Sequence, residues 1–291
     1  MKKSIILIPF LLLVATSCTS NPAPGKKTEK RPVNYIILLD LSDRLLCQNQ
    51  SERDRAIISA VFKEFDSQVR KNLVINSNDK FQIVISKQKG ASYNTRQFEN
   101  ELFIDMGSLN PGNKIGALTD FSKELSLRLT ELYTAACVGK KPSDYQGAAI
   151  WQFFNENLEY ITGSKYENCL VVLTDGYFDL EDYGHQLPSG NRFPTTSFLS
   201  AVRDDTSWKE KLEKSDIGLL PVKKEFNNLK VIVMGINPKY DFQYENDMLI
   251  YVWEKWCREM NISAFSAIPQ ASLPQSLSVL RDKIENSGSN L

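Results

Sequence analysis

A continuous apolar run from Tyr35 to Leu39 ends abruptly in an oxygen-rich turn that contains Asp40, Ser42 and Asp43. Such a run suits a strand that is buried on both faces of a parallel sheet. In open α/β sheets, ligands bind in the crevice beyond the carboxyl ends of the strands. The three polar side chains therefore stand where a site is expected, and an ordinary turn or helix cap is the alternative interpretation.

A second stretch has the same construction, because the apolar residues 169–173 are followed by Thr174, Asp175 and Gly176. Two parallel strands that both end in an acidic turn can bring Asp40 and Asp175 together. Neighbouring carboxylates repel each other unless a cation or a proton lies between them. Hydroxyl and carboxylate oxygens are hard ligands, so the pattern predicts Mg²⁺, with Mn²⁺ or Ca²⁺ as substitutes.

These two turns resemble the metal-ion-dependent adhesion site of the von Willebrand factor A (vWA) domain family. In that family a D-x-S-x-S motif follows the first strand, a Thr lies in a later loop, and an Asp follows the fourth strand. Asp40 and Ser42 match the first two positions, Asp175 matches the last, and Ser143 is the counterpart of the loop Thr. The resemblance implies a protein-binding module whose metal is contacted by an acidic side chain of the partner.

The motif departs from the family at one position, where Arg44 replaces the second Ser and stands beside Asp43. Arg44 brings a permanent positive charge in place of a ligand oxygen. Two hypotheses follow. In the first, the cation binds through Asp40, Ser42, Ser143 and Asp175 with one ligand fewer. In the second, the site has no cofactor, because Arg44 pairs with Asp40 or Asp175 and occupies the metal position.

The rest of the chain alternates apolar runs with amphipathic stretches, which predicts an α/β fold with a doubly wound, mostly parallel sheet and helices on both faces. The resemblance adds one antiparallel edge strand to this vWA-like or Rossmann-like plan. The predicted strands are 35–39, 81–85, 101–105, 169–173, 229–236 and 262–267. The predicted helices are 51–73, 114–136, 147–161, 198–214, 248–260 and 273–284, the first opened by a capping box at residues 51–54.

Residues 1–17 have a basic start, an apolar segment and small residues before Cys18, which predicts a signal peptide. This arrangement resembles the lipobox of bacterial lipoproteins of the Bacteroidetes-like kind, and implies that Cys18 carries acyl chains such as palmitate. We expect residues 18–33 to be the lipidated Cys and a flexible tether, and residues 34–291 to be a single domain. The tether lacks an acidic run, which favours a periplasm-facing position in the cell envelope.

Charge and motifs narrow the choice of function. Without Lys2 and Lys3 of the signal peptide, 33 basic residues stand against 35 acidic ones, so no basic excess points to nucleic acid. The sequence has no nucleophile elbow, P-loop or glycine-rich dinucleotide turn. A phosphotransferase of the haloacid dehalogenase type would use Asp40 as nucleophile. It would also need an Asp at the position of Ser42, so we expect a protein partner in the envelope and no enzyme activity.

Two further expectations concern loops. The long segment 176–200 follows Asp175 directly, and we expect it to overhang the site and to contact the partner. Its candidate contact residues are Tyr177, Phe178, Asp179 and Tyr183. Cys47 and Cys137 are the favoured disulfide pair in an envelope protein, whereas Cys169 and Cys257 are expected in the core.

Overall fold

A computed structural model describes residues 31–86, 91–145, 147–179, 190–224, 226, 228–262 and 264–285. The chain divides into two units between Lys30 and Arg31, and the described residues all belong to the second. Cys18 and Tyr183 lie outside the described residues. No helix in the described part of the chain is both long enough and apolar enough to cross a membrane.

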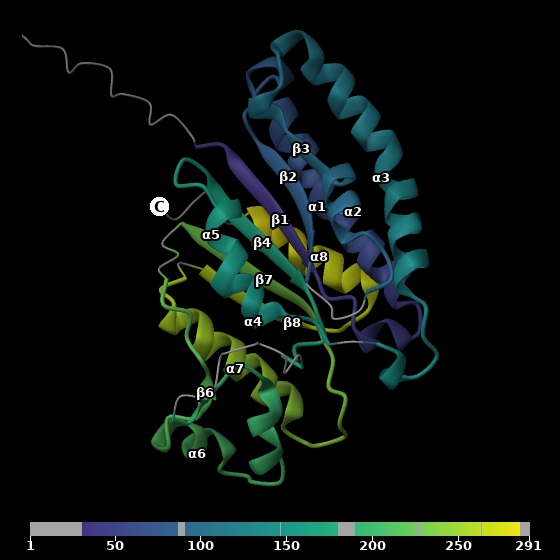
Figure 1. The fold of residues 1–291 in the computed structure, drawn as a ribbon. Coiled ribbons are helices and arrows are strands. Elements are labelled where there is room, and N and C mark those ends of the chain that lie inside the picture. Colours follow the sequence, from purple (N-terminus) through teal and green to yellow (C-terminus); the bar gives the residue numbers. More distant parts are fainter. Residues whose placement is uncertain are drawn as a thin grey trace, which may run out of the picture. The chain divides into compact units, whose positions relative to one another are not determined.

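Six of the described strands form one sheet in the order β3-β2-β1-β4-β7-β8 (Figure 1). The strands are β1 (Val33–Leu39), β2 (Lys80–Ile85), β3 (Phe103–Asp105), β4 (Glu167–Leu173), β7 (Leu229–Ile236) and β8 (Ala264–Pro269). All neighbours are parallel except β2 and β3, which are antiparallel. The predicted mostly parallel sheet with one antiparallel edge strand is confirmed, and it is compatible with a vWA-like fold.

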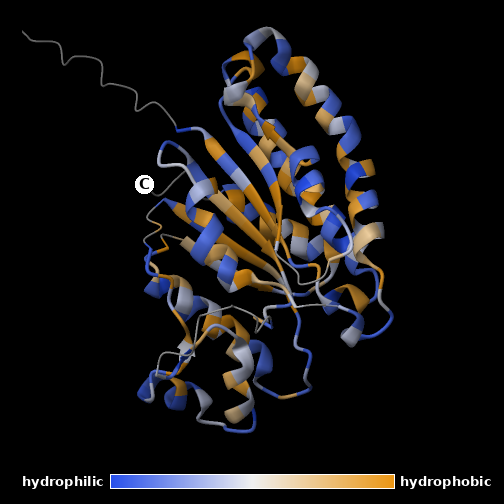
Figure 2. Cartoon of the chain, in the orientation of Figure 1, coloured by the Kyte–Doolittle hydropathy of each residue, from blue (hydrophilic) through white to orange (hydrophobic). Residues whose placement is uncertain are grey.

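Helices cover both faces of this sheet, as predicted. On one face, Ile37 and Leu39 share a core with α1 (Gln50–Lys71), α3 (Lys114–Ala136) and α8 (Leu273–Glu285). On the other face, Ile36 and Leu38 share a core with the helical segment 150–161 and with α7 (Glu245–Glu259). Successive strand residues point to opposite faces, so a strand with no polar alternation needs two cores. Figure 2 shows this hydrophobic character along the sheet strands.

The predicted helix 147–161 starts later and is not uniform. It consists of α4 (Ile150–Gln152), the π-helical turn η6 (Phe153–Asn157) and α5 (Leu158–Ile161). Its aromatic residues are core, as expected, since Trp151 is 2% exposed and Phe154 is fully buried. Trp253 and Trp256 of α7 are also buried and pack that helix against the sheet.

Three other element predictions need correction. The predicted helix 198–214 is instead the 3-10 helix η7 (Thr196–Ala201) and the separate helix α6 (Trp208–Lys214). The strands that precede and follow them in the sequence, β5 (Arg192–Phe193) and β6 (Gly218–Leu219), pair in a small second sheet. The predicted strand 101–105 is shortened by α2 (Thr95–Glu101). Helix α1 has Asn49 as its N-cap and no side-chain cap, so the predicted capping box is absent.

Short 3-10 turns connect the remaining elements. They are η1 (Asp43–Leu46), η2 (Val74–Asn76), η3 (Met106–Ser108), η4 (Pro111–Asn113) and η5 (Pro142–Asp144). The first of these follows β1 directly, and η5 lies against it. The turns η1 and η5 therefore lie together near the carboxyl end of β1.

The edge strand β3 pairs with only the first half of β2, from Lys80 to Gln82. Beyond this point, the Ile83 amide donates to the Leu102 carbonyl at 3.2 Å. The Ile85 amide donates to Glu99 Oε1 at 2.9 Å. Beyond Gln82, where β3 no longer pairs with β2, the Ile83 and Ile85 amides are thus bonded to a loop carbonyl and to a carboxylate.

Candidate functional site

The turns after β1 and β4 lie side by side. The two strands are parallel and in register from Val33 to Leu39, and the Asp40 amide donates to the Leu173 carbonyl at 3.0 Å. Asp40 Oδ2 accepts a hydrogen bond from Thr174 Oγ1 at 2.7 Å, and its Oδ1 accepts one from the Ser42 amide at 2.9 Å. The prediction that these turns meet at one edge of the sheet is confirmed.

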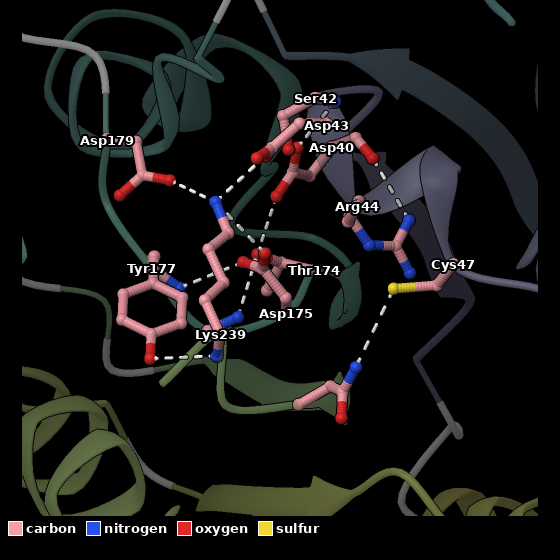
Figure 3. A network of polar contacts seen from close by, with 12 residues as sticks. Asp40, Ser42, Asp43, Arg44, Cys47, Thr174, Asp175, Tyr177, Asp179 and Lys239 are labelled. Atoms are coloured by element: carbon pink, nitrogen blue, oxygen red, sulfur yellow. Dashed lines mark hydrogen bonds and ion pairs between the residues drawn. The ribbon is translucent and has the colours of Figure 1, made fainter. Parts of the chain in front are cut away.

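A residue that the sequence analysis did not single out lies between the carboxylates. Lys239 Nζ is 2.9 Å from Asp43 Oδ1, 2.5 Å from Asp179 Oδ2 and 3.3 Å from Asp175 Oδ2. Figure 3 shows the ammonium between these three side chains. An ammonium group therefore stands among the strand-end carboxylates, where a metal was expected.

Local backbone structure brings Lys239 to this position. Strand β7 pairs with β4, and its register against β8 shifts between Met234 and Ile236. Gly235 in this irregularity has φ +89°, a conformation that favours glycine. The Asn237 amide then donates to the Asp175 carbonyl at 3.0 Å. The sequence contained a signal for this contact, because a loop after the strand beside β4 must reach the same sheet edge.

Burial sets the electrostatics of Asp175, which is 4% exposed. Burial first, and then the charge of Asp40, raise the pKa of Asp175 to about 7, although Lys239 acts in the opposite direction. Its Oδ1 accepts from the Tyr177 amide at 3.2 Å. Its buried Oδ2 accepts no hydrogen bond from the described residues and has only the ion-pair contact with Lys239.

Asp179 and Lys239 have side chains that are more exposed than that of Asp175. Burial raises the pKa of Asp179, and Lys239 offsets part of this effect. Burial alone would lower the pKa of Lys239, but the carboxylates of Asp175, Asp179 and Asp43 more than offset it, so the pKa is raised. Lys239 is therefore charged at neutral pH and acts as a fixed cation.

Arg44 is not part of this cluster, which corrects the hypothesis that it pairs with Asp40 or Asp175. Its guanidinium forms two hydrogen bonds with Asp54 of α1, at 2.7 and 3.0 Å. It also donates to the backbone carbonyl of Asp40 at 3.0 Å. Arg44 is 4% exposed and Asp54 is 1% exposed. A buried guanidinium needs a carboxylate partner, and Asp54 of α1 supplies it.

The two predicted serine ligands lie in different environments. Ser42 is buried at the start of η1, beside Asp40. Ser143 is exposed on η5, and no hydrogen bond joins its side chain to the carboxylates among the described residues. The hydroxyl that binds Asp40 belongs instead to Thr174. The assignment of Ser143 as a metal ligand stays a prediction.

The expectation that Tyr177 and Phe178 are exposed contact residues is wrong. Phe178 is fully buried and its ring centroid lies 4.6 Å from that of Trp253. Tyr177 is 4% exposed, donates to Glu245 Oε1 at 2.8 Å and accepts from the Lys239 amide at 3.2 Å. Tyr177 therefore supports the loop that carries Lys239, and Phe178 packs against α7. Asp179 keeps a side chain that is 38% exposed.

A cavity of about 360 Å³ opens beside the cluster. It is lined by the charged residues Asp43, Asp179, Lys239 and Arg203, by Tyr240 and by the hydroxyl residues 195–197. The Arg203 guanidinium lies 3.8 Å from the centroid of the Tyr240 ring, and its Nε lies 3.0 Å from Glu245 Oε2. A charged and aromatic surface thus borders the carboxylate cluster.

The thiols are free in this structure, so the predicted pairing of Cys47 with Cys137 is wrong. Cys137 is exposed, and Cys47 Sγ accepts a hydrogen bond from Asn237 Nδ2 at 3.8 Å. Cys169 and Cys257 are buried, as predicted.

The donor groups as arranged do not fit a resident divalent metal. Asp40 uses both carboxylate oxygens in hydrogen bonds, and Asp43, Asp175 and Asp179 surround an ammonium. Among the described residues, no group of three or more His, Cys, Asp or Glu side chains is placed to hold a metal ion. A metal would have to displace Lys239 before these oxygens could bind it.

Comparisons with known proteins give distant likenesses only. No protein-family model and no curated protein matches the sequence. Two crystal structures of the pilus adhesin SpaC from Lactobacillus rhamnosus GG have TM-scores of 0.39 and 0.40 at 9% identity, each with 88% of this chain covered. Proximal thread matrix protein 1 from the mussel byssus has a TM-score of 0.31 at 10% identity. The match to the mussel protein also covers 88% of this chain. This chain spans 48% of the length of the mussel protein and 30% of the length of each adhesin chain.

Proposed function

We propose that this chain is a vWA-like protein-binding module, anchored to a membrane on the extracytoplasmic side, that binds its partner at the sheet edge around Lys239. The observation that carries the proposal is the surface formed by Arg203, Tyr240 and Phe242. Tyr240 is 46% exposed and Phe242 is 37% exposed, and the Arg203 guanidinium lies over both rings. Tyr and Arg are enriched among the residues that dominate binding energy at protein interfaces.

The surface is held rigidly before any partner binds. Arg203 is fixed by Glu245, a fully buried carboxylate that also accepts a hydrogen bond from Tyr177. Side chains that are already ordered lose less conformational entropy on binding. The charged cluster next to them supplies the electrostatic complementarity that selects partners and excludes wrong ones.

An enzymatic role for Asp40 has less support. A nucleophilic carboxylate needs an oxygen that can reach the substrate. Asp40 is 1% exposed, and both oxygens accept hydrogen bonds, from the Ser42 amide and from the Thr174 hydroxyl. This environment suits a structural carboxylate that joins the turns after β1 and β4.

The binding surface is tested by affinity capture from envelope extract with the full-length chain. We compare wild type with Tyr240→Ala and Phe242→Ala, and with Tyr160→Ala as the matched control. Tyr160 is 83% exposed but lines a different cavity. We expect one protein to be retained by wild type and by the control and to be lost with the other two variants. Retention of the same proteins by all four chains would refute the proposed surface.

The captured protein is then purified and its affinity is measured directly. Interface residues of this kind contribute about 2 kcal/mol or more, which corresponds to about a 30-fold loss of affinity on truncation to Ala. Tyr160→Ala should leave the dissociation constant unchanged. A loss below about threefold for both Tyr240→Ala and Phe242→Ala would place the binding energy elsewhere.

The membrane anchor is a separate part of the proposal and depends on Cys18. Several acyl chains on one residue give stable anchoring, whereas a single chain binds reversibly. We expect Cys18→Ser to move the protein from the membrane fraction to the soluble fraction, while Cys47→Ser leaves it on the membrane. Protease treatment of intact cells distinguishes a periplasm-facing from a surface position. An unchanged membrane fraction for Cys18→Ser would contradict the lipoprotein assignment.

A further inference from the structure

We propose that Lys239 is the built-in cation of this site, so that the turns at the sheet edge are held together without a metal. The inference rests on the proposed function only in treating this edge as part of a binding surface. Its physical content concerns Lys239 and the carboxylates around it, and it can be tested without a partner.

The balance of charges requires a cation at this position. Four carboxylates, those of Asp40, Asp43, Asp175 and Asp179, lie in the turns after β1 and β4. The nearby arginines have other partners, because Arg44 pairs with Asp54 and Arg203 pairs with Glu245. Within the described part of the chain, Lys239 is the cation in ion-pair contact with three of the four carboxylates.

The geometry shows how one ammonium replaces a bound ion. Lys239 follows β7, whereas Asp43 follows β1 and both Asp175 and Asp179 follow β4. Its ammonium therefore joins the ends of three neighbouring strands through oxygens at 2.5 to 3.3 Å. Divalent ions bind oxygen at about 2.0–2.6 Å. A metal would thus require both the departure of Lys239 and a closer approach of the carboxylates.

The lysine is held in place by its own loop. The Lys239 amide donates to the Tyr177 hydroxyl at 3.2 Å, and its Nζ lies 5.3 Å from the centroid of the Tyr177 ring. Two residues before Lys239, the Asn237 amide donates to the Asp175 carbonyl. Because the backbone and the ring fix the start of the side chain, little additional freedom is lost when the ammonium pairs with the carboxylates.

This arrangement changes the kind of partner that the site accepts. A metal with an open position attracts an acidic side chain of a partner. Here the carboxylates outnumber the ammonium, so another acidic group would add to an uncompensated negative charge. Recognition then falls to the neighbouring surface of Arg203, Tyr240 and Phe242, and it is independent of divalent metal.

The test compares the thermal unfolding of wild type and Lys239→Met after chelation and after addition of millimolar Mg²⁺ or Mn²⁺. Without metal, we expect Lys239→Met to have a lower Tm than wild type, because the carboxylates lose their cation. Metal that binds only the folded state raises Tm with concentration. We expect this rise in Lys239→Met and no rise in wild type. The control is Lys123→Met, since Lys123 has a side chain that is 72% exposed on α3.

Two results of the Tm comparison would overturn the inference. The first is a metal-dependent rise in the Tm of wild type that equals the rise in Lys239→Met. The second is a Tm of Lys239→Met without metal that is no lower than that of wild type, which would show that the carboxylates do not depend on a cation. Direct titration of wild type with Mn²⁺, followed by electron paramagnetic resonance, needs no variant to fold. Stoichiometric Mn²⁺ binding by wild type would also overturn the inference.

Partner capture with and without a chelator separates this inference from the proposed function. If a partner binds equally in both conditions, both statements are supported. If it binds only when Mg²⁺ is present, protein binding holds and the metal-independent role of Lys239 fails. If no partner is captured, the proposed function fails, whereas the Tm comparison still decides the role of Lys239.

Discussion

The substitution Arg44→Ser separates the two interpretations of the departure from the adhesion motif. If Arg44 excluded a metal from the site, its replacement by the family residue would create cation binding. In the structure, Arg44 is instead the buried partner of Asp54. We therefore expect Arg44→Ser to destabilise the fold and to gain no affinity for Mg²⁺, because Lys239 still lies between the carboxylates.

The size of the effect follows from the partners that Asp54 retains. Loss of Arg44 leaves the Asp54 carboxylate, which is 1% exposed, with two hydrogen bonds from the described side chains: from Gln50 Nε2 at 2.8 Å and from Tyr133 Oη at 2.9 Å. Removing one partner of a buried ion pair costs about 3–5 kcal/mol. The two remaining donors place the expected loss near the lower limit, at about 3 kcal/mol. For a domain of this size, that corresponds to a decrease in Tm of roughly 6–12 °C.

Urea unfolding followed by tryptophan fluorescence measures the loss. The matched control is Arg70→Ser, which removes an ion pair with Asp66 on the same helix, where the Arg70 side chain is 60% exposed. An exposed pair of this kind contributes about 0.5 kcal/mol or less. The reasoning would be refuted if Arg44→Ser cost no more than Arg70→Ser, or if Mg²⁺ restored the stability of Arg44→Ser.

Three further predictions concern the same sheet edge and its surroundings. Folding raises the pKa of Asp175 from 3.8 to about 7. Between these pH values the folded chain keeps a proton on Asp175 that the unfolded chain releases. The contribution of Asp175 to the free energy of unfolding therefore decreases as the pH rises from about 4 to 7. Relative to Asp175→Asn, wild type should lose roughly 2–4 kcal/mol from pH 4 to pH 8 in urea unfolding, and a gain would contradict the assignment. Gly235→Ala should cost about 1–2 kcal/mol, since φ is +89° and the new Cβ would lie 3.4 Å from the Thr174 carbonyl, whereas Gly116→Ala in open space on α3 should be stabilising. In native protein without reductant, a thiol reagent should modify the exposed Cys137 first, and unfolding should release all four thiols of residues 31–291; fewer than four would indicate a disulfide.

Periodicity in the sequence was sufficient for the regular elements. The predicted ranges 114–136 and 229–236 coincide with α3 and β7. A long apolar stripe at helical spacing predicts the helix, and the apolar run 231–236 that follows Leu229 and Lys230 predicts the strand. The π-helical turn of residues 153–157 could not be predicted. It reflects a change of backbone hydrogen bonding inside an otherwise helical apolar segment, and no residue pattern marks it.

The polar contacts of the site were predictable only where they followed from strand order. Asp40 and Asp175 meet because parallel neighbouring strands end at the same edge. The same rule applies to Lys239, but it requires knowing that β7 lies beside β4. The sequence predicts Asp54 as part of a capping box, whereas in the structure Asp54 pairs with Arg44. This pair depends on the contact between η1, which carries Arg44, and α1, and the local sequence does not show that contact.

Tyr177 and Phe178 illustrate a different limit. Aromatic residues after a functional turn are candidates for partner contacts, yet both are buried. Phe178 packs against Trp253 and Trp256 of α7, and Tyr177 donates a hydrogen bond to Glu245 of the same helix. Local sequence cannot distinguish an exposed aromatic loop from one that completes a core. Beside this site, the aromatic residues with exposed side chains are instead Tyr240 and Phe242, which follow the neighbouring strand β7.

The outer side of β2 has a consequence for self-association. An edge strand with free amides is a template on which a second molecule can extend the sheet, and such growth leads to aggregates. Here Glu99 binds the Ile85 amide and the Leu102 carbonyl binds the Ile83 amide. An incoming strand would have to break both contacts and leave the Glu99 carboxylate without its amide donor. The chain thus protects this margin from fibril-like growth with one side chain and one loop carbonyl.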